Sequence, residues 1–165
     1  MKLNSLHDLY VSELKDLYDA ENRIIKALPK MVEAANSPDL RAAFEKHLQQ
    51  TRRHAERLEQ ILRSLDQSPK GKKCKGMEGI IDEGEDLMEE DAPESVADAA
   101  LIAAAQRVEH YEIAAYGTVR TYARRLGFED QAELLNQTLQ EEGETDKKLT
   151  SLAETSINEE AKTAR

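Results

Sequence analysis

Apolar residues recur every three or four positions along four long stretches of the chain. In residues 5–35 this stripe includes Leu17, Ile24 and Leu28. Residues at this spacing share one side of an α-helix, so the pattern predicts an amphipathic helix. The same pattern marks residues 37–65, 93–126 and 129–154, and a shorter version marks residues 77–90. An amphipathic helix buries its apolar side only against other elements, so these segments must pack together.

The composition also favours long helices. The chain of 165 residues contains 4 prolines and 7 glycines, and 4% of its residues are aromatic. Few residues therefore interrupt a helix, and the core must be built from Leu, Ile, Val and Ala. Helices of about 25–30 residues, each about 40 Å long, suit a four-helix bundle. We predict a single domain over residues 1–155 and a polar C-terminal tail, 156–165, which we expect to fray.

The lengths of the connections predict the topology. The first and second long helices are joined by a very short loop, as are the third and fourth, so each pair forms an antiparallel hairpin. The connection between the second and third is about 28 residues long and carries the short helix, which suits a crossover along the bundle. An up-down-up-down bundle would need only a short loop there. The predicted fold is therefore all-α, a ferritin-like four-helix bundle with a long crossover connection that carries a short fifth helix.

Charge and cysteine content exclude several classes of protein. The net charge is −10 and the sequence pI is about 5.0, which argues against a nucleic-acid-binding protein. Cys74 is the single cysteine, so no intrachain disulfide can form, as suits a reducing cytoplasm. No apolar run approaches the roughly 20 residues of a membrane span. We expect a cytoplasmic protein that binds neither nucleic acid nor membrane.

Ionisable residues interrupt the apolar sides of the four long segments near their middles. They are Glu21 in the first, His54 in the second, Glu109 and Glu112 in the third, and Glu142 and Asp146 in the fourth. His47 and Gln50 lie one to two turns before His54. When the hairpins pair, these residues reach one level of the bundle. A small rotation of the second helix would exchange His47 and His54 at that level.

Several carboxylates buried together repel one another, and their burial raises their pKa values. A divalent or trivalent metal ion removes this conflict, and carboxylate with imidazole suits iron or manganese. The residues named above therefore predict a metal site, with His47 and Gln50 as further candidate ligands. Two alternatives remain open. The acids can lie at the edges of the apolar stripes with their carboxylates in water, or they can form a hydrogen-bonded network without metal.

The chain resembles the YciF-like family of bacterial ferritin-like proteins, which is associated with stress responses. The matching stretches are LHDLYVSELKDLYDAE (6–21), HLQQTRRHAERLEQ (47–60), KCKGMEGIIDEGEDL (73–87), DAALIAAAQRVEHYEIAAYGT (98–118) and TLQEEGETDKKLTSLA (138–153). They span almost the whole chain. The resemblance implies a ferritin-like monomer of five helices, a homodimer and a di-metal centre, but no settled activity.

Rubrerythrin-type di-iron bundles offer a looser comparison. They use Glu on the first helix, Glu-x-x-His on the second, Glu-x-x-Glu on the third and Glu-x-x-His on the fourth. Glu21 and the pair Glu109 and Glu112 match this pattern. The second helix reads Thr51-x-x-His54 and lacks the carboxylate, and the fourth reads Glu142-x-x-Thr145 and lacks the histidine unless Asp146 replaces it. With these two ligands missing, three outcomes stay open: the site binds two metal ions with extra waters, binds one ion, or is degenerate.

These features leave two classes of function open. They do not decide whether the chain is an enzyme. A centre with one or two iron or manganese ions would react with O2 or peroxide. It would need an external reductant, because one cysteine cannot supply rubredoxin-like cysteine pairs, and we expect no organic cofactor. The alternative is a non-catalytic dimeric helical module with a degenerate metal site, which the missing ligands favour. Iron storage requires a large cage, which nothing in the sequence indicates.

Overall fold

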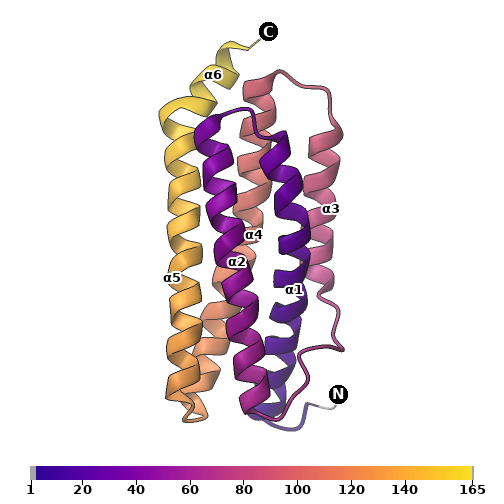
Figure 1. Ribbon diagram of the computed structural model, residues 1–165, viewed down its shortest axis with the longest axis vertical. Helices are drawn as coiled ribbons and strands as arrows, with labels where there is room; N and C mark the ends of the chain where they lie inside the picture. Colours follow the sequence, from indigo (N-terminus) through magenta and orange to yellow (C-terminus); the bar gives the residue numbers. More distant parts are fainter. Residues whose placement is uncertain (1–2, 165) are drawn as a thin grey trace.

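A computed structural model describes residues 3–164 of the chain, and the regular structure in this range is helical throughout. Four long helices, α1 (Leu6–Ala34), α2 (Pro38–Ser64), α4 (Glu94–Arg125) and α5 (Glu129–Leu152), run side by side along the long axis (Figure 1). A shorter helix, α3 (Lys75–Glu89), lies beside them. The prediction of an all-α fold is confirmed. Within residues 3–164, no helix combines the length and the apolar character that crossing a bilayer requires.

The helices begin and end at the residues that the sequence indicates. The Ser5 side chain accepts a hydrogen bond from the Asp8 amide at 3.0 Å, and α1 starts at the next residue. Ser37 caps α2 in the same way, and Pro38 is the first residue of that helix, where its missing N–H leaves no bond unmade. Gly127 has a φ of +79°, a conformation that lets the chain turn from α4 into α5.

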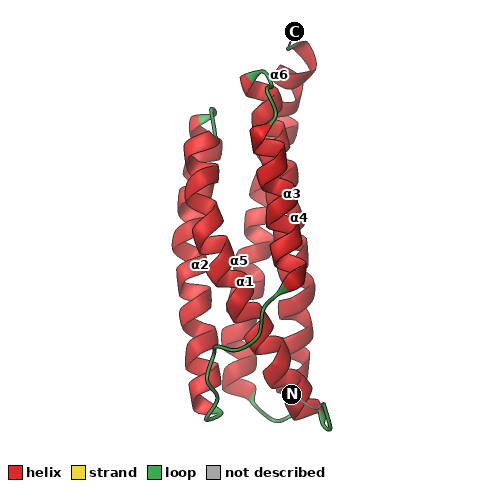
Figure 2. Ribbon diagram, turned by 90° about the vertical axis from the view of Figure 1, so that its right-hand side faces the viewer, coloured by secondary structure: helices red, strands yellow, loops and turns green. Residues whose placement is uncertain are grey.

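The connections give the topology that their lengths predict. Three residues join α1 to α2 and three join α4 to α5, so each pair is an antiparallel hairpin. Residues 65–93 carry the chain from the end of α2 along the bundle, through α3, to the start of α4 at the opposite end (Figure 1). As a result α2 and α4 run in the same direction. Helix α3 packs on α4 and α1, outside the four long helices (Figure 2).

The N-terminus of α3 is anchored to the bundle by Cys74. Its Sγ accepts a hydrogen bond from the Met77 amide at 3.4 Å, and its own amide donates to Asp19 at 2.8 Å. The Tyr111 ring lies so close to Gly76 that a Cβ there would stand 2.8 Å from Tyr111 Cε2. Glycine is therefore required where α3 meets α4. The single cysteine serves a structural role at this junction.

Two apolar clusters make up the core, one toward each end of the bundle. The first includes Ile24, Leu28, Phe44, Ala105 and Leu149. The second lies toward the opposite end. It contains Leu14, Leu17, Leu58, Tyr116, Val119 and Leu135, together with their neighbours. The ionisable residues singled out from the sequence lie near the middle of each long helix, where the two clusters meet. The core is therefore divided by a polar layer.

The C-terminal segment differs from the expected frayed tail. A π-helical turn, η1 (Ala153–Ile157), continues from α5 into α6 (Asn158–Thr163), and α6 packs on α4. Ile157 is 2% exposed and belongs to the first apolar cluster. η1 contacts α4 and α5, and the burial of Ile157 there holds a segment that its polar sequence suggested would fray.

Replacing Ile157 tests whether this segment is ordered. Ile157→Ala is expected to lower the free energy of unfolding by about 2–4 kcal/mol, because it removes buried methylene groups and leaves a cavity. Leu87→Ala on α3, where the leucine is 37% exposed, is the matched control and should cost less than about 1 kcal/mol. Urea denaturation followed by circular dichroism measures both. Equal effects of the two variants would mean that the tail does not pack on the bundle.

Candidate metal centre

The polar layer consists of six ionisable side chains that are almost completely buried. They are Glu21 on α1, His47 and His54 on α2, Glu109 and Glu112 on α4, and Glu142 on α5, and none is more than 3% exposed. Each long helix contributes at least one of them. The convergence predicted from the sequence is therefore present, and the alternative of carboxylates in water at the edges of the stripes does not apply to these residues.

The six side chains form two groups that share Glu142. The first group is His47, Glu109, Glu112 and Glu142, and the second is Glu21, His54 and Glu142. Within each group, one potential ligand atom per residue lies within 4.8 Å of the others. Each group therefore combines one imidazole with carboxylates, a donor set that suits iron or manganese.

Many polar atoms in these groups make no well-directed hydrogen bond among residues 3–164, although some of them lie close to one another. They are Glu21 Oε2, His47 Nε2, His54 Nδ1, Glu109 Oε2, both carboxylate oxygens of Glu112 and both of Glu142. A buried polar atom without a partner costs about 1–3 kcal/mol, and more if it is charged. A protein-only network would pair most of these atoms. The unpaired atoms all belong to metal-ligating residue types and face one another, so the residues present fit a metal centre.

Burial shifts the pKa values of the acids strongly. Loss of water around Glu21, Glu109 and Glu142 raises the pKa of each to about 7, and neighbouring charges in the cluster modify the shift. Burial and then the charges of Glu142, Glu21 and Glu109 raise the pKa of Glu112 well above its ordinary value. Without a cation, the polar layer therefore holds protons near neutral pH.

His54 is oriented by carboxylates on both sides of its ring. Nε2 lies 2.7 Å from Glu141 Oε2, and Nδ1 lies 2.7 Å from Glu142 Oε1 and 3.6 Å from Glu21 Oε1. Burial lowers the pKa of His54, but the charge of Glu21 and the contacts with Glu142 outweigh it and raise the pKa to about 9. In the metal-free protein the Nδ1 proton thus lies between two candidate ligands. A metal ion would displace this proton, while Nε2–H continues to donate to Glu141.

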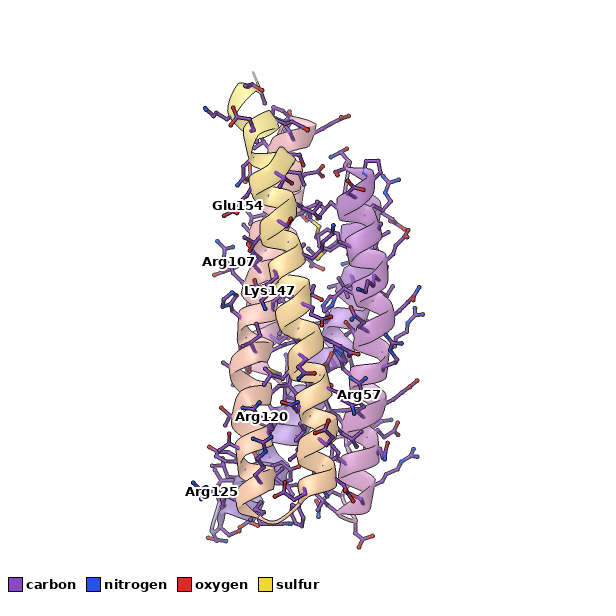
Figure 3. The ribbon with its side chains drawn as sticks, turned by 90° about the vertical axis from the view of Figure 1, so that its left-hand side faces the viewer. Arg57, Arg107, Arg120, Arg125, Lys147 and Glu154 are labelled. Atoms are coloured by element: carbon purple, nitrogen blue, oxygen red, sulfur yellow. The ribbon has the colours of Figure 1, made fainter. Side chains whose placement is uncertain are left out.

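Glu141 is in turn held by Arg57. The guanidinium reaches from α2 to α5 (Figure 3), and its Nη1 donates to Glu141 Oε2 at 2.8 Å and to Thr138 Oγ1 at 3.0 Å. Partial burial opposes ionisation of Glu141, but the bonds from Arg57 and His54 hold its pKa below the usual range. Arg57 and Glu141 therefore fix the orientation of a candidate ligand without belonging to either group.

The orientation of His47 follows from Thr145. The Thr145 hydroxyl donates to the Glu141 carbonyl at 3.0 Å, so its oxygen can accept from His47 Nδ1, 3.4 Å away. Nε2 then keeps its lone pair and faces Glu109 Oε1 at 3.1 Å. Thr145 stands where the rubrerythrin-type pattern has a histidine. In this protein His47 on α2 supplies the imidazole instead, and it lies beside the smaller side chain of Thr145.

Both histidines therefore face the site, and the sequence argument that a helix rotation would exchange them is wrong. Residues seven apart differ by only about 20° around an α-helix, so His47 and His54 lie on one stripe. Their ring centroids are 6.5 Å apart. Tyr116 closes the layer on the side of the second apolar cluster, where its hydroxyl donates a short hydrogen bond to Glu21 Oε1.

Two predicted ligands lie elsewhere. Asp146 is outside both groups, because its carboxylate accepts a hydrogen bond from Gln106 Nε2 at 3.0 Å and lies 3.2 Å from His110 Nε2. Asp146 lies one helical turn from Glu142 and faces α4 and the surface. It therefore does not replace the histidine that the rubrerythrin-type pattern has on the fourth helix. Gln50 is buried but lines a groove between α2 and α5 beside Thr145.

Sequence reasoning missed the residues that orient the histidines. Arg57 follows His54 by three residues and therefore shares its helix face, and Glu141 directly precedes a predicted ligand. Either spacing could have indicated a supporting role. Neither reveals that the two side chains meet, because they belong to different hairpins.

The stability of the metal-free protein should fall as the pH rises from 6.5 to 9. The unfolded chain releases the protons of the buried acids near pH 4.5, whereas the folded chain keeps them on Glu21, Glu109 and Glu142 up to about pH 7 and on Glu112 to higher pH. His54 acts in the same direction between pH 6.5 and about 9. The lowered pKa of His47 opposes the trend only below pH 6.5. Each kcal/mol lost lowers Tm by about 2–4 °C in a chain of this size. Calorimetry in chelator over this range measures the effect, and a flat or rising Tm would contradict the raised pKa values of Glu112 and His54.

Glu141→Gln tests the support of His54. Loss of the negative charge should lower the pKa of His54 below about 9 in an NMR titration of the metal-free protein. It should also weaken metal binding about 10–100-fold in a competition titration. Glu144→Gln, an exposed position on the same helix, removes the same charge and should change neither quantity. Identical results for the two variants would show that Glu141 does not position His54.

The chain matches known proteins along nearly its whole length. Residues 5–162 match DUF892, a domain family described as of unknown function. Protein YciF of Escherichia coli (strain K12) is 43% identical over 162 residues, which are 98% of this chain and 98% of that protein.

Solved structures agree with this assignment. The crystal structure of the E. coli stress protein YciF superposes with a TM-score of 0.90 at 44% identity, covering 94% of this chain and 98% of that one. A Rhodopseudomonas palustris protein described as YcfI, a putative structural protein, gives 0.87 at 42% identity, covering 90% and 95%. A Xanthomonas campestris protein at 22% identity, with a TM-score of 0.73 over 95% and 98% of the chains, shares the fold. With a matched family over residues 5–162 and a full-length relative in YciF, the chain belongs to the DUF892 family and is a homologue of the E. coli stress protein YciF.

Proposed function

We propose that this protein is a ferritin-like four-helix protein whose polar layer holds two iron or manganese ions that react with O2 or peroxide. The observation that carries the proposal is the set of unpaired, buried ligand atoms arranged in two groups around Glu142. A carboxylate shared by two groups that each contain an imidazole suits two adjacent cations.

The chain's own residues perform four tasks in this proposal. Glu109, Glu112 and His47 would hold the first ion, and Glu21 and His54 the second, with Glu142 common to both. When bound, such ions supply redox chemistry toward oxygen species. Arg57 and Glu141 keep the Nδ1 atom of His54 directed inward. The two apolar clusters exclude water from the layer on either side.

The relatives support a protective role. The E. coli homologue is described as a stress protein, and consumption of O2 or peroxide by a reduced metal centre would protect a stressed cell. The residues of the polar layer provide no electron donor of their own, so continued turnover would draw on an external reductant.

A non-catalytic helical module is the second candidate. It is favoured by the substitutions at two positions of the di-iron pattern, where Thr51 donates to the His47 carbonyl at 2.8 Å and Thr145 faces His47. The R. palustris relative is described as a putative structural protein. In this reading the histidines and acids pair with one another, as His54 and Glu142 can at 2.7 Å.

Metal content separates the two functions. Protein purified without chelator or nickel resin, then reconstituted with Fe(II) or Mn(II), should contain about two ions per chain by elemental mass spectrometry. Glu112→Ala removes a ligand of the first group only and Glu21→Ala one of the second only, so each should retain about one ion. Glu142→Ala weakens both groups and should retain the least.

Glu144→Ala is the matched control, because this exposed residue of α5 lies two positions from Glu142. It should keep the wild-type metal content. Glu112→Leu should stabilise the metal-free protein, since it replaces a buried carboxyl that has two unpaired oxygens with an apolar side chain of similar volume. Wild-type protein that binds no metal after reconstitution would leave the non-catalytic module as the function.

A further inference from the structure

A cavity under α3 leads to the polar layer. It has a volume of about 40 Å³ and lies among α1, α3 and α4, with α2 at its inner end. Most of its lining is apolar, including Ile24, Leu28, Phe44, Ile80, Ala105 and Val108. A single water needs about 10–15 Å³, so the space admits a molecule of a few atoms.

The polar residues of this cavity lie at its two ends. Glu85 lines the outer end, where its half-exposed side chain pairs with Lys30 at 2.6 Å. His47 and Glu109 line the inner end, where they are 3% and 1% exposed. Among the described residues, Glu109 Oε2 and His47 Nε2 make no well-directed hydrogen bond, although His47 Nε2 lies 3.1 Å from Glu109 Oε1. The cavity thus connects the neighbourhood of a surface ion pair with two candidate ligands of the first group.

The lining selects against polar and charged molecules. An ion or a strongly hydrated molecule would lose its water along apolar walls that offer no hydrogen bonds, which disfavours its entry. A small neutral apolar molecule loses almost nothing there, and cavities lined by Leu, Ile and Phe stay dry and bind gases such as xenon. Of the oxidants named in the proposed function, dioxygen fits this lining and peroxide does not.

We infer that the cavity beneath α3 binds dioxygen and delivers it to the His47–Glu109 side of the metal centre. Delivery to the metal centre rests on the proposed function, whereas binding of the gas depends only on the cavity. It assigns a role to α3, which packs on α1 and α4 outside the four long helices and forms the outer wall (Figure 2).

Gly84 allows a matched test of the cavity. It lies on α3 in the lining, and a Cβ there would meet only the Ala104 Cβ, at 3.4 Å. Gly84→Leu should fill the space. Gly79 lies on the same helix, is exposed and has nothing within 4 Å of a Cβ, so Gly79→Leu makes the same change outside the cavity. If Gly84→Leu displaces α3, Ala105→Leu serves as the second variant, because it fills the cavity from α4.

Xenon is the probe for the gas site. Crystals of the metal-free protein pressurised with xenon should show an anomalous peak among Ile80, Ala105 and His47 in the wild type and in Gly79→Leu. The peak should be lost in Gly84→Leu or, where that variant does not fold, in Ala105→Leu. Absence of xenon from the wild-type cavity, or a peak that persists when the cavity is filled, would overturn the inference.

Oxidation of the iron-loaded protein tests delivery. Gly84→Leu should slow oxidation by dissolved O2 relative to Gly79→Leu at equal iron content, and its rate with peroxide should match that of the control. Equal rates with O2 would overturn the delivery route while leaving the metal centre in place. A chain that binds xenon but no iron would overturn the proposed function and the delivery role together, and the two failures are therefore distinguishable.

Discussion

The mutual repulsion of four buried carboxyl groups is the constraint on which the arrangement of this protein depends. Glu21, Glu109, Glu112 and Glu142 lie between two apolar clusters that would otherwise form one continuous core. Their desolvation is compensated only by protons or by a cation, because the two histidines cannot neutralise four acids. Near neutral pH the metal-free protein is therefore less stable than it would be with a continuous apolar core. Such a feature is typical of a site that serves function rather than folding.

The supporting contacts share one effect: they keep one ring nitrogen of each histidine directed toward the polar layer. Glu141 accepts from His54 Nε2, and Thr145 can accept from His47 Nδ1. Both supporting residues lie on α5, one turn apart, and both histidines lie on α2. The α2–α5 contact joins the two hairpins, so the site is assembled at the interface where tertiary packing brings separate parts of the chain together.

Helix α3 contributes to this site from outside. Its anchoring through Cys74 and Gly76 places Ile80 and Gly84 over the gap between α1 and α4. The crossover connection therefore has two roles. It carries the chain from one end of the bundle to the other, and it forms the wall of an apolar cavity that reaches His47 and Glu109.

The sequence by itself determined the number of helices in the bundle, their ends and the layer of acids. These properties depend on local rules, such as the 3.6-residue period, the caps at Ser5 and Ser37 and the three-residue loops. It also determined that five of the six predicted first-choice ligands would converge. Tertiary structure decided what depends on contacts between hairpins. His47 joined the site because Thr145 left it room, and Asp146 left the site because Gln106 and His110 hold its carboxylate. The packing of Ile157 ordered the C-terminal segment in the same way, since this segment packs on α4, which lies far away in sequence.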